Sequence, residues 1–335
     1  MLAVDLRPEV AQGGYGRAMG AALRDGRVAR DHGAVPAPVV RAFHYRAFDL
    51  PRLVEAKRET TISVCLPARD EEDTVGEIVE LIQHELVERW PLVDEILVID
   101  DRSIDGTAKV AADAGARVVS TEEVLPDFDD LGGKGDALWR SVFAADGDII
   151  VWCDADIRNF GARFVIGLVG PLLMRHDVAF VKGYYDRPLD GRDGEGGRVT
   201  ELVARPLVSL LFPHLSTIIQ PLGGEYAGRR EILEQLPFAT GYGVDLALLI
   251  DISARFGLES IAQVDLGTRI HRNRSLDELS PQAMAIMQTV LARSGLALPH
   301  GPARPLVRPG SEPVLVETID RPPLIDLASY RRRSA

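Results

Sequence analysis

Apolar runs of strand length alternate with helical periodicities between residues 61 and 156 of the chain. Four short apolar runs, typical of buried strands, occupy residues 61–68, 94–101, 116–120 and 148–156. Between them, apolar residues recur at helical spacing over 73–90, 103–115 and 133–146. This alternation predicts an α/β protein with a parallel sheet and right-handed crossovers. Because ligands bind beyond the carboxyl ends of the strands in such sheets, we expect the functional site at that edge.

The pattern outside this region is more mixed. We predict further strands over 178–185 and 258–274, the second of which runs into a basic loop. We predict further helices over 49–59, 198–212, 239–257 and 280–295. The first residues are rich in Gly, Ala and Arg with weak periodicity, and the last are rich in proline. We therefore expect a loosely structured N-terminal extension and an irregular C-terminal arm that packs on another subunit.

Composition narrows the class of protein. The chain has 335 residues with a formal net charge of −12, which argues against a general nucleic-acid-binding protein. The longest apolar stretch, 164–174, is too short to span a bilayer and contains Pro171, and no secretory signal is visible. Cys65 and Cys153 both lie inside apolar runs, as expected of buried thiols in a reducing compartment. We expect a cytoplasmic protein with neither nucleic acid nor membrane as a partner.

Two carboxylates, Asp154 and Asp156, end the fourth predicted strand. Like charges this close disfavour each other's ionised form, so we expect a positive group beside them. Two hard oxygen ligands suit Mg²⁺ or Mn²⁺, which often binds through carboxylates together with substrate phosphates. The alternative is a strand-end turn with solvated carboxylates, and the position at the end of a parallel strand favours the metal.

Polar residues that suit a nucleotide follow the first and second strands. In the segment LPARDEE, Glu71 can accept from ribose hydroxyls, and in VIDDRS, Asp101 can accept from the N–H groups of a base. In LGGKGDALWRS, the glycines free the backbone to approach a ligand, and Lys134 adds a positive charge before a helix. That charge suits a diphosphate. The alternative for the acidic residues is helix capping.

Two later segments suit smaller anions. In GGRVTELVARPL, Gly197, Arg198 and Thr200 stand where a helix is predicted to begin, so N–H groups, a hydroxyl and a guanidinium form an anion site. In TRIHRNR, His271 can complete a metal site and the neighbouring arginines can bind phosphate oxygens. The alternatives are a capped surface helix and a solvated basic loop. Positive charge concentrated in an acidic chain favours a small anionic ligand.

The order of these motifs carries a resemblance to a known family. LPARDEE, VIDDRS, GGKGDALWRS, CDAD and GGRVTELVARPL are followed by QPLGGEYA, GYGVD and HRNR. This order resembles the glucosyl-3-phosphoglycerate synthases of actinobacteria and their mannosyl-specific relatives, over residues 55–295. The resemblance implies a GT-A glycosyltransferase fold with a Rossmann-like, mainly parallel sheet, a homodimer, and a divalent cation, Mg²⁺ with Mn²⁺ or Co²⁺ as alternatives. It also implies transfer of a hexose from a UDP- or GDP-hexose to the 2-hydroxyl of 3-phosphoglycerate, with retention.

The resemblance also implies roles for residues of this sequence. The nucleotide sugar would contact Pro67, Ala68, Glu71, Asp101, Lys134, Asp154, Ala155, Leu222, Tyr242, Arg269 and Arg274. The acceptor would contact Gly197, Arg198, Val199, Thr200 and Asn273. The metal would be bound by Asp156 and His271, and catalysis would depend on Asp156, Asp245 and Arg198. The chain would divide into an N-terminal extension (1–55), a nucleotide-sugar-binding half (56–160), an acceptor-binding half of the same domain (161–297) and a C-terminal arm (298–335).

Three departures from the family pattern concern the donor. Ala155 separates the two metal-motif aspartates where glucosyl members commonly have serine, Asp101 replaces a serine, and Asp245 replaces a glutamate. The donor therefore stays open between UDP-glucose, GDP-glucose and GDP-mannose, with glucose favoured. A mannosyl-3-phosphoglycerate synthase that uses GDP-mannose is the nearest alternative. The others are a sugar-phosphate nucleotidyltransferase, a polyprenyl-phosphate glycosyltransferase and a silent binding module.

The expected mechanism is a same-face displacement. No carboxylate is evidently placed as a covalent nucleophile, so we expect the leaving phosphate to take the acceptor proton. Asp245 is the candidate nucleophile if a covalent route exists instead.

Overall fold

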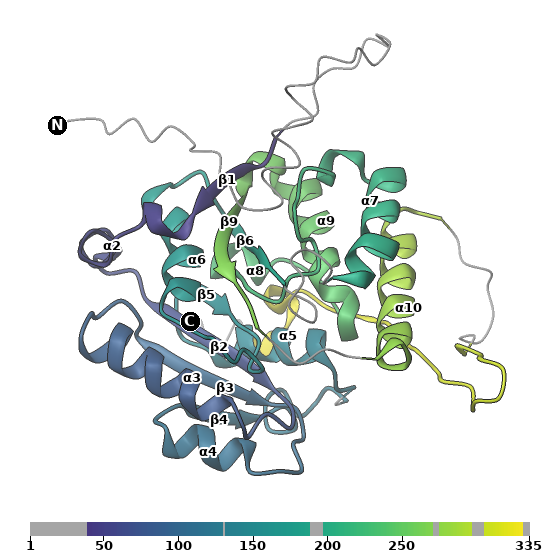
Figure 1. Ribbon diagram of the computed structural model, residues 1–335, viewed down its shortest axis with the longest axis horizontal. Coiled ribbons are helices and arrows are strands. Elements are labelled where there is room, and N and C mark those ends of the chain that lie inside the picture. The colour runs from purple at the N-terminus through teal and green to yellow at the C-terminus, as the bar shows by residue number, and fades with distance from the viewer. Residues whose placement is uncertain (1–38, 130, 188–196, 271–274, 297–304, 331–335) are drawn as a thin grey trace, which may run out of the picture.

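A central sheet of eight strands organises the computed structural model, which describes residues 39–129, 131–187, 197–270, 275–296 and 305–330 (Figure 1). The strand order is β1-β9-β6-β7-β5-β2-β3-β4. The strands are β1 (Arg41–His44), β2 (Ile62–Ala68), β3 (Glu95–Asp100), β4 (Arg117–Ser120), β5 (Ile149–Trp152), β6 (Phe180–Asp186), β7 (Tyr226–Arg229) and β9 (Ile261–Thr268). β7 runs antiparallel to β5 and β6, and the other neighbours pair in parallel. The predicted mainly parallel α/β sheet is confirmed.

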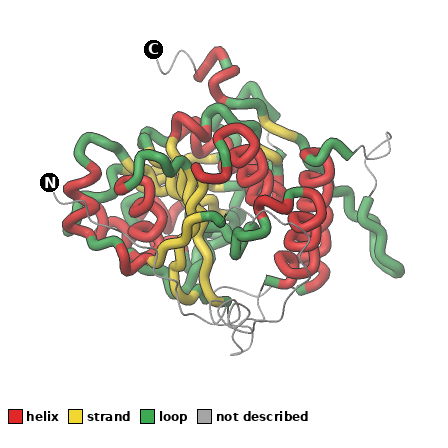
Figure 2. Tube along the Cα trace, turned by 90° about the horizontal axis from the view of Figure 1, so that it is seen from above, coloured by secondary structure: helices red, strands yellow, loops and turns green. Residues whose placement is uncertain are grey.

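Helices cover both faces of this sheet, as Figure 2 shows. Successive strand residues point to opposite faces, so Val64 and Leu66 of β2 join one buried apolar cluster while Cys65 joins the other. The first cluster is covered by α2 (Leu50–Lys57), α3 (Val75–Ile82), α4 (Thr107–Asp113) and α6 (Arg163–Met174). The second is covered by α5 (Lys134–Ala144), α7 (Arg205–Leu211), α8 (Arg230–Leu233), α9 (Val244–Phe256) and α10 (Leu276–Arg293).

The predicted helices are present with shifted ends. α3 continues into a π-helical segment at Gln83–Glu88. Together the two segments occupy most of the helix predicted over residues 73–90. α10 begins four residues before the predicted start because Ser275 caps it. The Ser275 hydroxyl accepts from the backbone N–H of Glu278, and the Glu278 carboxylate accepts from that of Ser275. None of the described helices is long and apolar enough to cross a membrane.

Part of the predicted N-terminal extension belongs to the folded core. Residues 41–44 form β1, which pairs in parallel with β9 at the edge of the sheet. Leu53 of α2 is buried in the apolar cluster beneath α6. The boundary expected at residue 55 therefore falls inside packed structure, because strand β1 is too short to show a periodicity of its own.

The described part of the C-terminal arm packs on its own chain. β10 (Asp320–Arg321) pairs antiparallel with β8 (Phe238–Ala239), just before α9. Leu324, Leu327 and Tyr330 are buried in the apolar cluster that contains α5 and α9. Residues 305–330 thus differ from the expected arm on another subunit, because their apolar side chains complete the core of the same molecule.

Candidate active site

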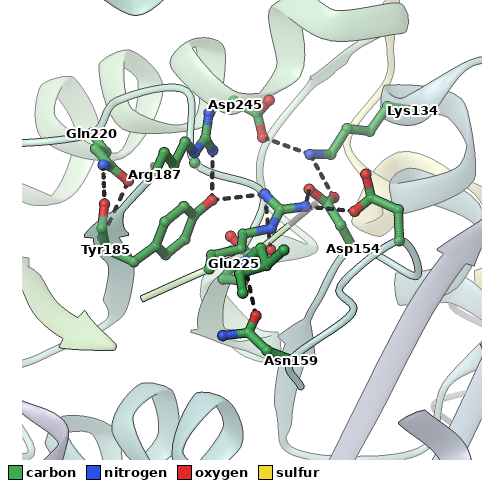
Figure 3. A network of polar contacts seen from close by, with 12 residues as sticks. Lys134, Asp154, Asn159, Tyr185, Arg187, Gln220, Glu225 and Asp245 are labelled. Atoms are coloured by element: carbon green, nitrogen blue, oxygen red, sulfur yellow. Dashed lines mark hydrogen bonds and ion pairs between the residues drawn. The ribbon is translucent and has the colours of Figure 1, made fainter. Parts of the chain in front are cut away.

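The predicted chemistry gathers at the carboxyl edge of the sheet. Asp154 and Asp156 follow β5, and Arg269 directly follows β9. Lys134 begins α5 and Asp245 lies in the first turn of α9. Figure 3 shows the resulting network of polar contacts, in which side chains from separate elements meet. The parallel topology explains this meeting, since it brings strand ends and helix starts to one edge.

Lys134 joins two of the predicted carboxylates. Its ammonium nitrogen lies 3.1 Å from Asp154 Oδ1 and 3.3 Å from Asp245 Oδ1. Burial alone would raise the pKa of the Asp154 carboxyl, but Lys134 and Arg269 outweigh burial and hold it well below its usual range. Burial likewise favours the neutral form of Lys134, yet the nearby carboxylates raise its pKa. Both side chains therefore stay charged at neutral pH.

Arg269 is the positive group beside the paired carboxylates. It is 3% exposed, and its Nη2 lies 2.9 Å from Asp154 Oδ2 and 2.6 Å from Asp156 Oδ1. Its Nη1 donates to the Tyr185 hydroxyl at 2.8 Å and lies 3.4 Å from Glu225 Oε1. Burial opposes the charge of Arg269, but these acidic neighbours raise its pKa further above the usual value. The guanidinium thus holds both carboxylates of the Asp-x-Asp element in fixed positions.

The structure adds two buried charges that the sequence reasoning missed. Lys182 of β6 is 1% exposed, and its ammonium donates to the carbonyl oxygen of Gly223 at 2.6 Å. It also lies 3.9 Å from Asp245 Oδ1 and 4.1 Å from the centre of the Tyr226 ring. Glu225 is fully buried, and burial raises the pKa of its carboxyl despite Arg269. The sequence signal for a buried charge was a single charged residue inside an otherwise uncharged segment, Lys182 in FVKGYY and Glu225 in GGEYA.

The QPLGGEYA segment packs directly against the site. A Cβ atom at Gly224 would lie 2.0 Å from Asp154 Oδ2, so only glycine permits this approach. Leu222, predicted to shape the sugar pocket, is half-buried against the apolar cluster that contains α5 and α9. The backbone of this turn therefore forms one wall beside Asp154.

The predicted base-side residues form a second group at the ends of β2 and β3. The backbone N–H of Asp101 donates to the carbonyl oxygen of Ala68 at 2.9 Å. Its carboxylate Oδ2 accepts from the backbone N–H of Gly133 at 2.9 Å, which ties this edge to the turn before Lys134. Pro67 is half-buried at the end of β2. The backbone N–H of Glu71 donates to the Thr107 hydroxyl at 2.8 Å.

The remaining predicted residues lie on neighbouring segments. Ala155 is buried, and its carbonyl oxygen accepts from the Thr74 hydroxyl at 2.6 Å. Tyr242 is half-buried in the turn before α9. In the predicted acceptor segment, Thr200 is buried, Gly197 has a φ of 84°, and Arg198 and Val199 are half-buried.

The predicted metal ligands are partly described. His271, Asn273 and Arg274 lie outside the described residues. The preceding residue, Ile270, donates its N–H to Asn159 Oδ1 at 2.8 Å, and its carbonyl oxygen accepts from the Arg158 N–H at 3.0 Å. The chain before His271 is therefore bound to the loop that carries Asp156.

These residues fit a divalent cation. The Asp156 carboxylate supplies a hard oxygen ligand, and an imidazole follows the anchored Ile270 in the sequence. Within the described segments, no group of three or more His, Cys, Asp or Glu side chains is arranged to hold a metal.

The site combines fixed opposite charges with little exposure. Lys134 and Arg269 both lie beside the carboxylates and remain charged, so positive charge is held in fixed positions at this edge of the sheet. The buried glycine turn and Asp101, whose carboxylate accepts from the Gly133 N–H, lie beside these charges. The arrangement suits a ligand that joins a diphosphate to polar, uncharged groups.

Comparisons with known proteins agree with this chemistry. A model of the family described as "Glycosyl transferase family 2" matches residues 63–241. The glucosyl-3-phosphoglycerate synthase of Petrotoga mobilis is 46% identical over 314 residues, which cover 88% of this chain and 96% of that protein. The Mycolicibacterium smegmatis protein of the same name is 50% identical over 249 residues, 73% and 81% of the two chains.

Solved structures of glucosyl-3-phosphoglycerate synthase also match this chain over most of its length. The glucosyl-3-phosphoglycerate synthase of Mycobacterium tuberculosis, in complex with Mn²⁺, UDP-glucose and phosphoglyceric acid, matches with a TM-score of 0.79 and 43% identity. The match covers 88% of this chain and 99% of that chain. A structure of the same enzyme with Mg²⁺ and UDP matches with a TM-score of 0.77 and 44% identity, over 86% and 99% of the two chains.

Proposed function

The chain belongs to glycosyl transferase family 2, among the glucosyl-3-phosphoglycerate synthases, and we propose that it transfers glucose from UDP-glucose to 3-phosphoglycerate. One observation carries the proposal: the likeness extends over nearly the whole length of the relatives. The described network is consistent with it, since Lys134 contacts Asp154, and Arg269 contacts Asp154 and Asp156. A nucleotidyltransferase or a silent binding module has no comparable support.

The donor end of the reaction follows from the charges of the site. Lys134 and Arg269 would stabilise the leaving diphosphate as its negative charge develops. Asp156 and His271 would hold a divalent cation, Mg²⁺ or Mn²⁺, which supplies further charge stabilisation for the leaving group when bound. Asp101 and Glu71 would hold the nucleoside at the ends of β2 and β3.

The sugar and the acceptor would meet between α9 and the segment that begins at Gly197. Asp245, Tyr242 and Leu222 would bind the hexose, and Arg198 and Thr200, with Gly197, Val199 and Asn273, would hold 3-phosphoglycerate. Asp245 Oδ1 lies between Lys134 and Lys182, at 3.3 and 3.9 Å, which stabilises its negative charge. This favours Asp245 as a binding group rather than a covalent nucleophile, and we retain same-face displacement. A glycosyl-enzyme trapped in mass spectra would contradict it.

The experiment that tests the function is a donor panel. The protein is incubated with 3-phosphoglycerate and Mg²⁺ against UDP- and GDP-linked glucose and mannose, and the product is identified by mass spectrometry. We expect glucosyl-3-phosphoglycerate from UDP-glucose. Preferred use of GDP-mannose would favour the mannosyl alternative, and no transfer from any donor would refute the function. Replacement of the exposed Asp113 by Ala serves as a control that leaves turnover unchanged.

An apolar stripe offers a place for the proposed homodimer. Leu202 and Leu210 are 76% and 78% exposed, and Pro206 is exposed between them, at a spacing of four residues along the helix that leads into and forms α7. We expect a second copy of the chain to cover this stripe. Replacing Leu210 by Glu should then convert a dimer to a monomer in light scattering. A cytoplasmic location stays a prediction.

A further inference from the structure

Arg187 stands at the end of β6, at the rim of the site, without an assigned role. Its Nη2 donates to the Tyr185 hydroxyl at 2.6 Å, and its guanidinium carbon lies 4.9 Å from the centre of the Tyr185 ring. Figure 3 shows it beside Tyr185 in the same network as Lys134 and Asp154. Its Nε is buried and donates to no acceptor in the described part of the protein. The phenol thus orients this guanidinium without using all its donors.

The charge of Arg187 is not neutralised as the charges of its neighbours are. Lys134 contacts Asp154 and Asp245, Lys182 faces Asp245, and Arg269 contacts Asp154, Asp156 and Glu225. The charge of Arg187 lowers the pKa values of Asp154 and Glu225 from a distance, but no carboxylate among the described residues forms a contact ion pair with it. Burial, against the opposing effect of the two arginines, raises the pKa of Tyr185 to about 12, so the phenol stays neutral. The guanidinium therefore keeps one unsatisfied N–H donor and is contacted by no carboxylate among the described residues, so it can still pair with an anionic ligand.

The position of Arg187 decides which ligand it faces. Arg187 and Arg269 both donate to the Tyr185 hydroxyl, so Arg187 lies one side chain away from the group that contacts Asp156. In the proposed function the donor diphosphate would have Arg269, Lys134 and the divalent cation as positive partners. Ten residues after Arg187, the chain reaches Gly197, where the acceptor segment begins.

We propose that Arg187 binds a negatively charged group of the acceptor, the phosphate or the carboxylate of 3-phosphoglycerate. Two parallel N–H donors match either group in a bidentate contact. Tyr185 fixes the orientation of the guanidinium, because its hydroxyl accepts a hydrogen bond from Nη2 and its ring packs against the guanidinium group. The inference rests on the proposed function and adds an acceptor residue that is remote in sequence from Arg198 and Thr200.

The test compares Arg187→Met and Arg187→Lys with the wild type in steady-state kinetics. For Arg187→Met we expect the KM for 3-phosphoglycerate to rise about ten-fold or more, the size of a lost contact to a charged group. The KM for UDP-glucose should change less than about two-fold, because the donor contacts remain. Arg187→Lys keeps the charge but loses the paired donors, so its KM for 3-phosphoglycerate should lie between the values for the wild type and Arg187→Met.

The matched control is Arg89→Met. Arg89 is an exposed arginine that pairs with Glu85 away from the site, so its loss should leave both KM values unchanged. Thermal unfolding of Arg187→Met should match the wild type, because Arg269 still donates to Tyr185. If only the KM for UDP-glucose rises, or if neither KM moves, the proposal is overturned. If the wild type itself transfers no glucose to 3-phosphoglycerate, the proposed function fails instead.

Two acceptor analogues identify the group that is bound. Glycerol 3-phosphate lacks the carboxylate and glycerate lacks the phosphate, and both are used as competitive inhibitors. Arg187→Met should raise the inhibition constant of the analogue that retains the bound group and leave the other unchanged. An equal rise for both would indicate a general change of the pocket and would overturn a direct contact.

Discussion

Replacing Lys182 by Met should change how the stability of the protein depends on pH. Burial lowers the pKa of Lys182 from 10.5 to about 8, and attraction to Asp245 offsets this only in part. A pKa difference of this size makes the charged form less favourable in the folded protein by about 3 kcal/mol. Methionine fills a similar volume without the charge, so the variant removes this cost. It also removes the donor for the Gly223 carbonyl oxygen, which costs about 1–3 kcal/mol.

The sign of the pH dependence follows from proton release. Between about pH 8 and pH 10.5, the unfolded chain keeps a proton on Lys182 that the folded chain has released. The free energy of unfolding of the wild type therefore rises with pH in this window. The variant lacks this titration, so the difference between wild type and variant should shift in favour of the wild type by about 1.4 kcal/mol from pH 7 to pH 9 and about 2.5 kcal/mol by pH 10. Near pH 7 the two opposing costs leave the proteins close in stability.

Urea unfolding at pH 7, 8, 9 and 10, followed by tryptophan fluorescence, measures this difference. Burial raises the pKa values of Tyr185 and Tyr226, and their protons stay bound over this range. Lys109→Met is the control, because Asp113 raises the pKa of Lys109 and keeps it charged up to pH 10. A wild-type minus Lys182→Met difference that stays constant with pH would refute the reasoning that Lys182 is buried beside Asp245 with a lowered pKa.

Three further substitutions test other parts of the site. Asp156→Ala should abolish glucose transfer and its dependence on Mg²⁺, measured as UDP release with and without the metal; retained metal-dependent turnover would contradict the role of Asp156. Gly224→Ala places a methyl group 2.0 Å from Asp154 Oδ2, so kcat/KM should fall about ten-fold or more, as expected of a displacement that costs 1–3 kcal/mol. Unaltered kinetics would show that the turn yields freely. Arg321→Met removes one of the buried cations bound to Asp136 and should lower the free energy of unfolding by about 3 kcal/mol in urea titrations, whereas a loss below about 1 kcal/mol would show that the arm contributes little.

The order of strands and helices from β2 to β5 could be predicted because each element carries its own periodicity. β7 could not, since Tyr226–Arg229 is four residues long, contains Gly228 and becomes a strand only between β5 and β6. β1 likewise depends on β9, which lies more than two hundred residues further along the chain. Strands of this length take their conformation from their neighbours rather than from intrinsic preference.

The predicted site residues divide in the same way. Asp154 and Lys134 could be placed at one edge because strand ends and helix starts are readable in the pattern, whereas Asp245 was expected there only from the family resemblance. The structure brings all three into contact. Lys182 and Glu225 could not, since each is a single charge within an apolar segment. Such a charge indicates a buried partner, but the partner is chosen by the packing of strands and helices that are remote in sequence.

The order of the charges shows why these two residues belong to the site. Contacts run from Lys182 to Asp245, Lys134, Asp154, Arg269 and finally Glu225, so each step joins side chains of opposite charge from different elements. Removing Lys134, Asp154 or Arg269 therefore leaves its partners incompletely neutralised in a buried environment, where the cost is large. Lys182 differs, because the cost of burying its own charge offsets its attraction to Asp245. Lys182 contacts Asp245 and interacts electrostatically with Glu225 and Asp154, so a substitution at Lys182 should weaken donor binding through these carboxylates. The buried lysine and the exposed rim of the site are parts of one electrostatic unit.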